Sequence, residues 1–309
     1  MGWRIVIIEN EGKLHIKNKQ LVFKTEDKSK SIPIEDIDFI ILDNRRITIT
    51  HPLMDELAKN CIPLMTTNEK HEISGILFSY WNQYRKLEVL NKQIDIPAPL
   101  KKQLWKKIIE HKILNQSLVL KKYSINKYEY LTECSKKVKS GDSSNLEATT
   151  SAFYFNALFS GENYKFVRQD FRCSKVSTLN AALNYTYSII RSVIIKYIIG
   201  AGFIPYLGIF HKSKTNSFNL ADDLIEVFRP IADFHVYKYE EELKENNFNR
   251  LDARLRKEMQ KIYLYELLID GKWTRFSASC KIMAFSFLNA INENNYNNFL
   301  CPLDWRINI

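Results

Sequence analysis

The sequence predicts an α+β protein, with a small N-terminal β-domain over residues 1–75 and a larger all-α domain over residues 76–309. Short segments rich in Val, Ile, Thr and Phe recur at regular intervals in the first part, which is typical of strands. From Ile76 onward the apolar residues recur at helical spacing instead. A chain of 309 residues is long enough for two modest domains with a sizeable buried core.

In the β-domain, strands are expected where β-branched and aromatic residues cluster between turn signals. The first turns are expected at Asn10-Glu11-Gly12 and at Asn18-Lys19. One short helix is expected at Pro52–Lys59, because its apolar residues share a face. The expected strands are Arg4–Glu9, Leu14–Lys17, Gln20–Lys24, Ser31–Ile34, Asp38–Leu42, Arg46–Thr50 and Ile62–Thr66.

In the second domain, a long helix is expected at Leu100–Tyr123, where Trp105, Ile108, Ile109, Ile113 and Leu120 recur at helical spacing. Further helices are expected at Asn145–Phe159, Leu179–Ile199, Leu220–Phe228, Arg250–Ile269 and Thr274–Asn292, with Gly271 placed to end the fourth of these. The longest apolar stretch, Ser192–Phe210, contains a lysine, glycines and a proline. It therefore predicts a buried helix and loop, not a membrane span.

The net charge of +10 favours a polyanionic partner, because Lys and Arg that pair with phosphates release condensed counterions. A merely basic protein explains the charge equally well. The five cysteines are scattered and include no CxxC motif, so the sequence predicts a reducing compartment, the cytoplasm, without disulfides or a zinc site. A P-loop, GxGxxG, GxSxG, HExxH and ExxH are all absent from the sequence.

What remains for chemistry is a set of acids and one histidine in the second half. Glu147 follows Ser144 by three residues, so a capping box at a helix start accounts for it without any chemistry. His211 follows a Gly/Pro-containing loop, where a chain reversal would present it. A lone histidine is more often a surface or core residue, and His235, near Asp233, is its nearest competitor.

A second acidic segment runs from Asn219 to Pro230. Asn219 can cap a helix here. Asp223 and Glu226 lie three residues apart on one helix face, next to apolar residues, so they need a neutralising cation. Arg229 or a metal ion could supply it. One histidine with carboxylates suits Mg²⁺ or Mn²⁺, but spacing alone leaves open whether these residues meet.

Several segments, taken together and in order, resemble a known family. They are Asn145-Leu-Glu147 with Phe153-Tyr154-Phe155, Leu179–Tyr187, Gly202–His211, Asn219–Pro230 and, near the start, Gly2-Trp3-Arg4 and Ser31–Ile37. The family is the CRISPR-associated integrase, the larger subunit of the spacer-acquisition complex, in the variant found beside Cas9-type (type II) systems. Thr186 and Thr149-Thr150 depart from the family pattern without touching an expected ligand.

The resemblance implies a β-domain for dimerisation and complex assembly, and a helical domain that holds the metal and the DNA. It assigns Glu147, His211 and Glu226 as catalytic metal ligands for Mg²⁺ or Mn²⁺. It places Asp223 as a supporting or alternative ligand and Asn184 as a supporting residue. The implied reaction joins the 3′-hydroxyl ends of a short prespacer duplex into a CRISPR repeat by transesterification. The implied partners are double-stranded DNA, a second copy of the chain, a small second adaptation protein, and a Cas9-type effector with an accessory protein.

The lysines between residues 101 and 139, together with Arg250, Arg254, Arg256, Lys257 and Lys261, could contact the DNA backbone. For most of them a solvated helix face is the simpler interpretation. Trp81, Tyr84 and Trp105 could stack on bases, although helical spacing favours core positions. Two other functions stay open: a non-catalytic basic DNA-binding scaffold subunit, and a metal nuclease that cuts DNA without joining it.

Overall fold

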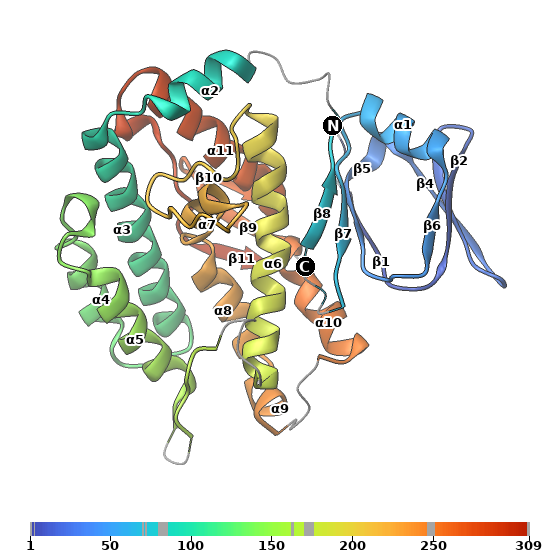
Figure 1. The fold of residues 1–309 in the computed structure, drawn as a ribbon. Coiled ribbons are helices and arrows are strands. Elements are labelled where there is room, and N and C mark those ends of the chain that lie inside the picture. The colour runs from blue at the N-terminus through green and yellow to red at the C-terminus, as the bar shows by residue number, and fades with distance from the viewer. Residues whose placement is uncertain are drawn as a thin grey trace. The chain divides into compact units, whose positions relative to one another are not determined.

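The computed structural model describes residues 2, 4–69, 71, 73–79, 86–161, 164–169, 176–245 and 251–307 (Figure 1). The chain divides into two compact units, Met1–Tyr84 and Arg85–Ile309. The first is built around β-strands and the second is mostly helical, which confirms the α+β fold class. The division falls after residue 84 and not after residue 75, because strand β8 (Ile73–Leu77) continues the first unit. The expected start of helical structure at Ile76 is therefore wrong.

The described part of the first unit contains two four-stranded sheets. One has the order β1-β5-β7-β8 and the other has the order β4-β3-β2-β6. Strand β5 is buried along its whole length, as expected of an apolar strand with parallel neighbours on both sides. The remaining bounds are β1 Arg4–Ile8, β2 Gly12–Lys17, β3 Gln20–Lys24, β4 Ser29–Pro33, β5 Ile37–Leu42, β6 Ile47–Ile49 and β7 Leu64–Thr67.

Local sequence explains the turns and the α-helix α1 of this unit. Asn18 and Lys19 both have positive φ angles, 49° and 57°, which is the backbone of the tight turn that joins two antiparallel strands, here β2 and β3. Helix α1 (His51–Lys59) buries Leu53 and Leu57 in the core of the sheets. Strand β8 lacks a clear strand signal, because it is short, partly exposed and contains Gly75.

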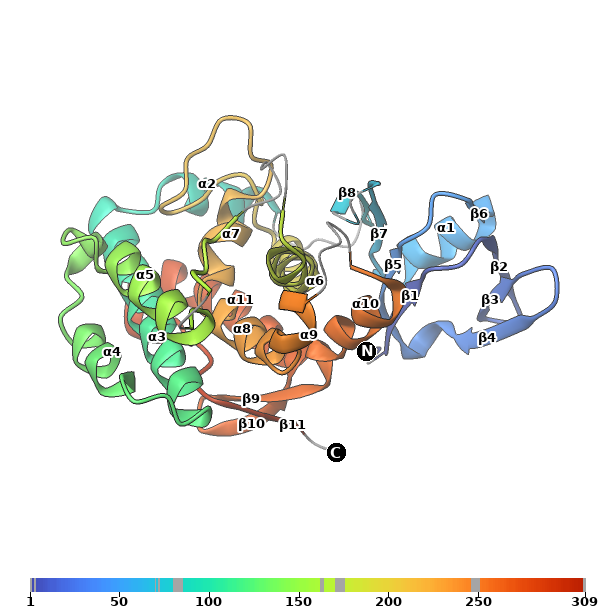
Figure 2. The ribbon, with the colours of Figure 1, turned by 90° about the horizontal axis from the view of Figure 1, so that it is seen from below.

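The second unit is organised around two long helices, α3 (Ala98–Lys122) and α6 (Thr178–Gly200). Helices α7 (Asn219–Ile225) and α8 (Arg229–Tyr237) contact both of them, so the second acidic segment lies between α3 and α6. Figure 2 shows this arrangement with α6 seen end-on. The other helices are α2 Lys86–Ile94, α4 Tyr128–Ser135, α5 Leu146–Phe159, α9 Glu240–Glu245, α10 Ala253–Gln260 and α11 Phe276–Asn292.

The second unit is not all-α, which corrects the prediction. It holds a three-stranded sheet with the order β10-β9-β11, made of Lys272–Arg275, Tyr265–Ile269 and Trp305–Ile307. Asp270 and Gly271 have positive φ angles of 51° and 70°, so they form the hairpin turn between β9 and β10. Gly271 therefore ends a strand and not a helix. The helix expected up to Ile269 stops at Gln260, where α10 ends.

The stretch Ser192–Phe210 forms the buried end of α6 and the loop after it, as predicted. No helix within the described ranges is long and apolar enough to cross a membrane. Cys61, Cys134, Cys280 and Cys301 form no disulfide within the described ranges, and Cys173 lies outside the described residues.

Candidate functional site

Two of the three predicted metal ligands meet around the ammonium group of Lys112. Glu147 lies in the first turn of α5, and Glu226 follows α7 directly. Lys112, in the middle of α3, forms ion pairs with both carboxylates, and its Nζ lies 2.6 Å from Glu226 Oε2. The two glutamates therefore approach each other around one positive charge. The expectation that Lys112 contacts DNA is wrong, because the residue is only 5% exposed.

The sequence signal for this lysine is its position on α3. Lys112 follows Ile108 by four residues and Ile109 by three, so it lies on the buried face of the helix. A lysine on an apolar face needs a buried partner of opposite charge. The sequence therefore indicates that Lys112 has an acidic partner, but it does not identify which acid this is.

The start of α5 leaves the Glu147 side chain free for this ion pair. The predicted capping box between Ser144 and Glu147 is wrong. Asn145 precedes the helix in the left-handed conformation and makes no capping hydrogen bond with its side chain. The Asp142 carboxylate instead accepts hydrogen bonds from the first two backbone N–H groups of α5, at 2.9 and 3.0 Å. Because Asp142 satisfies the helix start, the Glu147 carboxylate is available to a cation.

Glu226 lies between two cations. Arg229 Nε donates to Glu226 Oε1 at 2.7 Å, which answers the need for neutralisation that the sequence indicates. Burial by itself raises the pKa of Glu226, but Arg229 and Lys112 outweigh it and hold this pKa at about 2. In the described part of the chain, Glu226 Oε2 receives no hydrogen bond of regular geometry, although the ammonium of Lys112 is close to it.

Asp223 anchors the loop that carries His211. Its carboxylate is fully buried and accepts hydrogen bonds from the backbone N–H groups of Ile209, Phe210 and His211, at 2.6, 3.1 and 3.0 Å. The same carboxylate lies 2.7 Å from His211 Nδ1. Asp223 therefore fixes both the backbone and the ring of His211. It lies in α7, one helical turn before Glu226.

This geometry prepares the other ring nitrogen of His211 to bind a metal. With Nδ1 donating to Asp223, the lone pair of Nε2 is free, and the described residues give Nε2 no hydrogen-bond partner. The hydrogen bond to Asp223 raises the pKa of His211, against the effect of burial. Trp105 and Phe210 are stacked, with ring centroids 4.0 Å apart, and both meet the imidazole edge-on. The two aromatic rings limit the orientation of His211.

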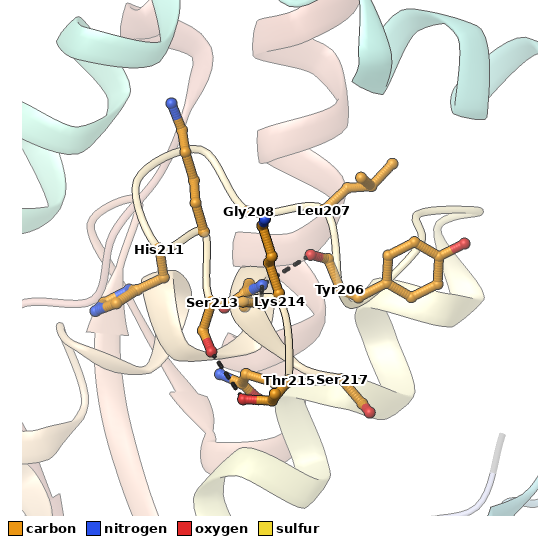
Figure 3. A pocket seen from close by; sticks show the side chains of 11 residues that line it. Tyr206, Leu207, Gly208, His211, Ser213, Lys214, Thr215 and Ser217 are labelled. Atoms are coloured by element: carbon orange, nitrogen blue, oxygen red, sulfur yellow. Dashed lines mark hydrogen bonds between the residues drawn. The ribbon is translucent and has the colours of Figure 1, made fainter.

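The loop between α6 and α7 surrounds an open hollow of about 600 Å³ next to His211 (Figure 3). Asn219 holds this loop, because its Nδ2 donates to the carbonyl groups of Tyr206 and Ser213 at 3.1 and 2.9 Å. The prediction that Asn219 caps α7 is therefore wrong. Asp222 pairs with Arg191 at 2.9 Å and accepts a hydrogen bond from Asn216 Nδ2 at 2.5 Å, so it holds another part of this loop.

Gly208 is required by the tight packing of this loop. A Cβ atom at residue 208 would lie 2.5 Å from the His211 carbonyl oxygen and 2.7 Å from Asp223 Oδ2. We therefore expect Gly208→Ala to displace the His211 loop, at a cost of about 1–3 kcal/mol in the free energy of unfolding. We also expect the joining reaction that the resemblance implies to slow by roughly tenfold or more. Gly200→Ala is the matched control, because nothing lies within 4 Å of its added Cβ. Thermal unfolding and joining rates that are unchanged in Gly208→Ala would contradict this account of the loop.

Asn184, predicted to support the ligands, reaches the site only through a chain of contacts. Its Oδ1 accepts a hydrogen bond from Arg168 at 2.6 Å. The guanidinium groups of Arg168 and Arg229 lie 5.3 and 4.7 Å from the centroid of the Tyr187 ring. Arg229 in turn holds Glu226. The described hydrogen bonds of Asn184 include none to a predicted ligand.

His235, the competing histidine, is bound elsewhere. It is buried, its Nε2 lies 2.8 Å from the Glu258 carbonyl oxygen, and burial lowers its pKa to about 4. Its neighbour Asp233 is buried as well and accepts a hydrogen bond from the Tyr187 hydroxyl. Burial raises the pKa of Asp233 to about 6, and the hydrogen bond from Tyr187 and the charges of Arg168 and Arg229 offset this only in part.

These two groups give stability opposite dependences on pH. The fold favours neutral Asp233, so this contribution is complete below the unfolded pKa of 3.8 and is lost as pH rises through about 6. The fold also favours neutral His235, so that contribution is present above 6.5 and is lost as pH falls through about 4. We expect Asp233→Asn to remove the first dependence, so that Tm rises more steeply between pH 4 and 6.5 than in the unmodified chain. Parallel curves of Tm against pH for the two proteins would contradict this assignment.

A divalent cation fits the chemistry of the site. The donors are two carboxylates and an imidazole with its Nε2 free, which suits Mg²⁺ or Mn²⁺. The ammonium of Lys112 shows that the space between Glu147 and Glu226 accepts a positive charge. Among the described residues, no three His, Cys, Asp or Glu side chains are already gathered tightly enough to hold an ion. The carboxylates are directed at Lys112, so a metal would have to replace it.

Some of the expected DNA-contacting residues are occupied by ion pairs. Arg254 pairs with Glu242, and Lys261 lies 2.8 Å from Glu258. Trp105 is buried, as helical spacing favours. Trp81, Tyr84 and Arg250 lie outside the described residues.

Comparison with known proteins identifies relatives along almost the whole chain. The family model described as CRISPR associated protein Cas1 matches residues 5–267. The CRISPR-associated endonuclease Cas1 of Neisseria meningitidis serogroup C (strain 8013) is 37% identical, over 98% of this chain and 96% of its own length. A CRISPR-associated endonuclease Cas1 of Francisella tularensis subsp. novicida is 24% identical, over 87% of this chain and 89% of its own length.

Solved structures share the fold. A casposase bound to its integration product superposes with a TM-score of 0.77 at 20% identity, covering 95% of this chain and 93% of its own. A Cas1 protein from Thermotoga maritima has a TM-score of 0.75 at 17% identity, covering 94% of this chain and 97% of its own. A chain of a Cas6-RT-Cas1–Cas2 complex has a TM-score of 0.75 at 19% identity, covering 96% of this chain and 36% of its own.

Proposed function

This chain belongs to the Cas1 family of CRISPR-associated endonucleases, and from that premise we propose that it joins the 3′ ends of short duplex DNA into a CRISPR repeat in a reaction that needs a divalent cation. The observation that carries the proposal is the approach of Glu147 and Glu226 around one cationic group, while Asp223, one helical turn before Glu226, holds His211. The casposase neighbour, bound to an integration product, adds support from a protein of the same fold.

In the proposed site, Glu147, Glu226 and His211 would hold the ion. When bound, Mg²⁺ or Mn²⁺ stabilises the negative charge that develops on a phosphodiester under attack. Asp223 keeps the imidazole in the tautomer with a free Nε2, and Arg229 holds the Glu226 carboxylate in place. The protein performs no covalent chemistry of its own, so positioning and charge stabilisation supply the rate enhancement.

The proposed reaction is a transesterification. The 3′-oxygen of the prespacer forms a new bond to phosphorus at the edge of the repeat, and the bond from that phosphorus to the 3′-oxygen of the array strand breaks. One phosphodiester replaces another, so the reaction needs no external energy source, and the reverse reaction is expected as well. The basic composition of the chain favours binding to both DNA substrates.

The proposed assembly is a dimer of this chain bound to a small second adaptation protein. The Cas6-RT-Cas1–Cas2 complex among the structural neighbours supports the pairing with a second adaptation protein. A direct test combines the purified chain, the second adaptation protein, a labelled prespacer and a supercoiled plasmid that carries the array. We expect label to appear in the plasmid with Mn²⁺ or Mg²⁺ and not with EDTA. Cleavage without joining would favour a nuclease, and salt-sensitive binding without any covalent product would favour a scaffold.

A further inference from the structure

Lys112 neutralises the two candidate ligand carboxylates in the absence of any metal. Glu147 and Glu226 carry two negative charges, and Lys112 and Arg229 carry two positive charges, so this group of four is neutral as it stands. Arg229 Nε donates its hydrogen bond to Glu226 Oε1. The ammonium of Lys112 lies at Glu226 Oε2 and Glu147 Oε1, the oxygens that face each other across the site.

We propose that Lys112 is a built-in counter-cation, which occupies the space between Glu147 and Glu226 in the metal-free protein and must leave when a divalent cation binds. This inference rests on the proposed function, because it assigns the metal to these carboxylates. An ammonium and a divalent ion compete here for the same oxygens. They also repel each other when both are close, and solvent screens this repulsion only in part, because Lys112 and Glu226 are buried and only the Glu147 side chain is partly exposed.

Replacement of the Lys112 ammonium by a divalent ion has two consequences. Without metal, Lys112 prevents repulsion between the two carboxylates, so the helical unit folds without an ion. With metal, part of the binding free energy is used to displace the ammonium, so affinity for the ion is lower than the donors alone would give. Lys112 is therefore a positioning residue, which keeps the ligands together until the ion arrives.

Variants without the Lys112 charge distinguish its effect on stability in the absence of metal from its effect on metal affinity. We expect Lys112→Met and Lys112→Gln to bind Mn²⁺ at least roughly tenfold more tightly than the unmodified chain, as measured by the electron paramagnetic resonance signal of free Mn²⁺. In EDTA, we expect Tm to fall by roughly 5–15 °C, because the buried Glu226 and the half-buried Glu147 lose a shared counter-charge, and Mn²⁺ should restore it. Lys106→Met is the matched control: it lies on the same helix and its surface partner is Glu110, at 3.4 Å, so Mn²⁺ affinity should stay within roughly twofold of the unmodified value.

The outcomes are distinguishable. If the unmodified chain joins DNA with Mn²⁺ but both Lys112 variants bind Mn²⁺ no more tightly, the counter-cation role is wrong and the proposed function stands. If Mn²⁺ binding is insensitive to His211→Ala and no joining occurs, the proposed function fails and the Lys112 proposal fails with it. If both Lys112 variants unfold in EDTA, recovery of the fold on addition of Mn²⁺ supports the proposal, and lack of recovery overturns it.

Discussion

His211→Ala is expected to lower the rate of strand joining by roughly a thousandfold or more while the chain stays folded. The His211 side chain is 40% exposed, so its loss removes a proposed metal ligand without opening a cavity in the core. Asp223 keeps its hydrogen bonds from three backbone N–H groups, so the loop retains its anchor. Joining of a labelled prespacer, Tm and DNA affinity together measure the effect.

The matched control for this variant is His51→Ala, which removes another exposed imidazole, at the start of α1 in the first unit. Joining by this control should be unchanged. DNA affinity of His211→Ala should also stay close to that of the unmodified chain, because phosphate contacts do not depend on this ring. Joining at a near-normal rate by folded His211→Ala would show that His211 is not a ligand of the catalytic ion.

Asp223→Asn is expected to lower the free energy of unfolding by about 2–4 kcal/mol and joining by roughly a hundredfold or more. The Asp223 carboxylate accepts hydrogen bonds from three backbone N–H groups and lies next to His211 Nδ1. An amide keeps one acceptor oxygen and turns an NH₂ group toward donors, so at least one buried N–H loses its partner. The imidazole also loses the group that fixes its tautomer.

Urea unfolding and joining assays test this prediction. Asp222→Asn is the control, because the Asp222 carboxylate pairs with Arg191 and accepts a hydrogen bond from Asn216, whereas Asp223 accepts those of the backbone at residues 209–211. The control should show a smaller loss of stability and a smaller loss of joining. Equal effects for the two variants would contradict the role of Asp223 as the anchor of His211.

Sequence reasoning was most successful where local patterns decide the structure. The first strands with their clustered β-branched and aromatic residues, the turn at Asn18-Lys19 and the long helices α3 and α6 depend on neighbouring residues, and the structure agrees with them. It failed at Asp270-Gly271, where a glycine after an apolar run suits both a helix end and a hairpin. The choice between them depends on pairing with β11, which lies far along the chain.

In the candidate site, too, some features can be predicted from the sequence and others depend on contacts between distant segments. The resemblance pointed to Glu147, His211 and Glu226, and the structure brings the two glutamates to one lysine and directs His211 with Asp223. The role of these residues as metal ligands remains a prediction. Lys112 and Asp142 were missed as members of the site, because their partners come from other elements and only the tertiary fold brings them together. A buried lysine signals that acids are close by, but it does not identify them.

The central claim is that Glu147, Glu226 and His211 bind one divalent cation. Diffraction from crystals soaked with Mn²⁺, recorded for the anomalous scattering of that ion, tests this claim most directly. The account predicts one anomalous peak at coordinating distance from Glu147, Glu226 and His211 Nε2, with the Lys112 ammonium moved away from both carboxylates. A peak bound by other residues, or none at Mn²⁺ concentrations that support strand joining, would contradict it.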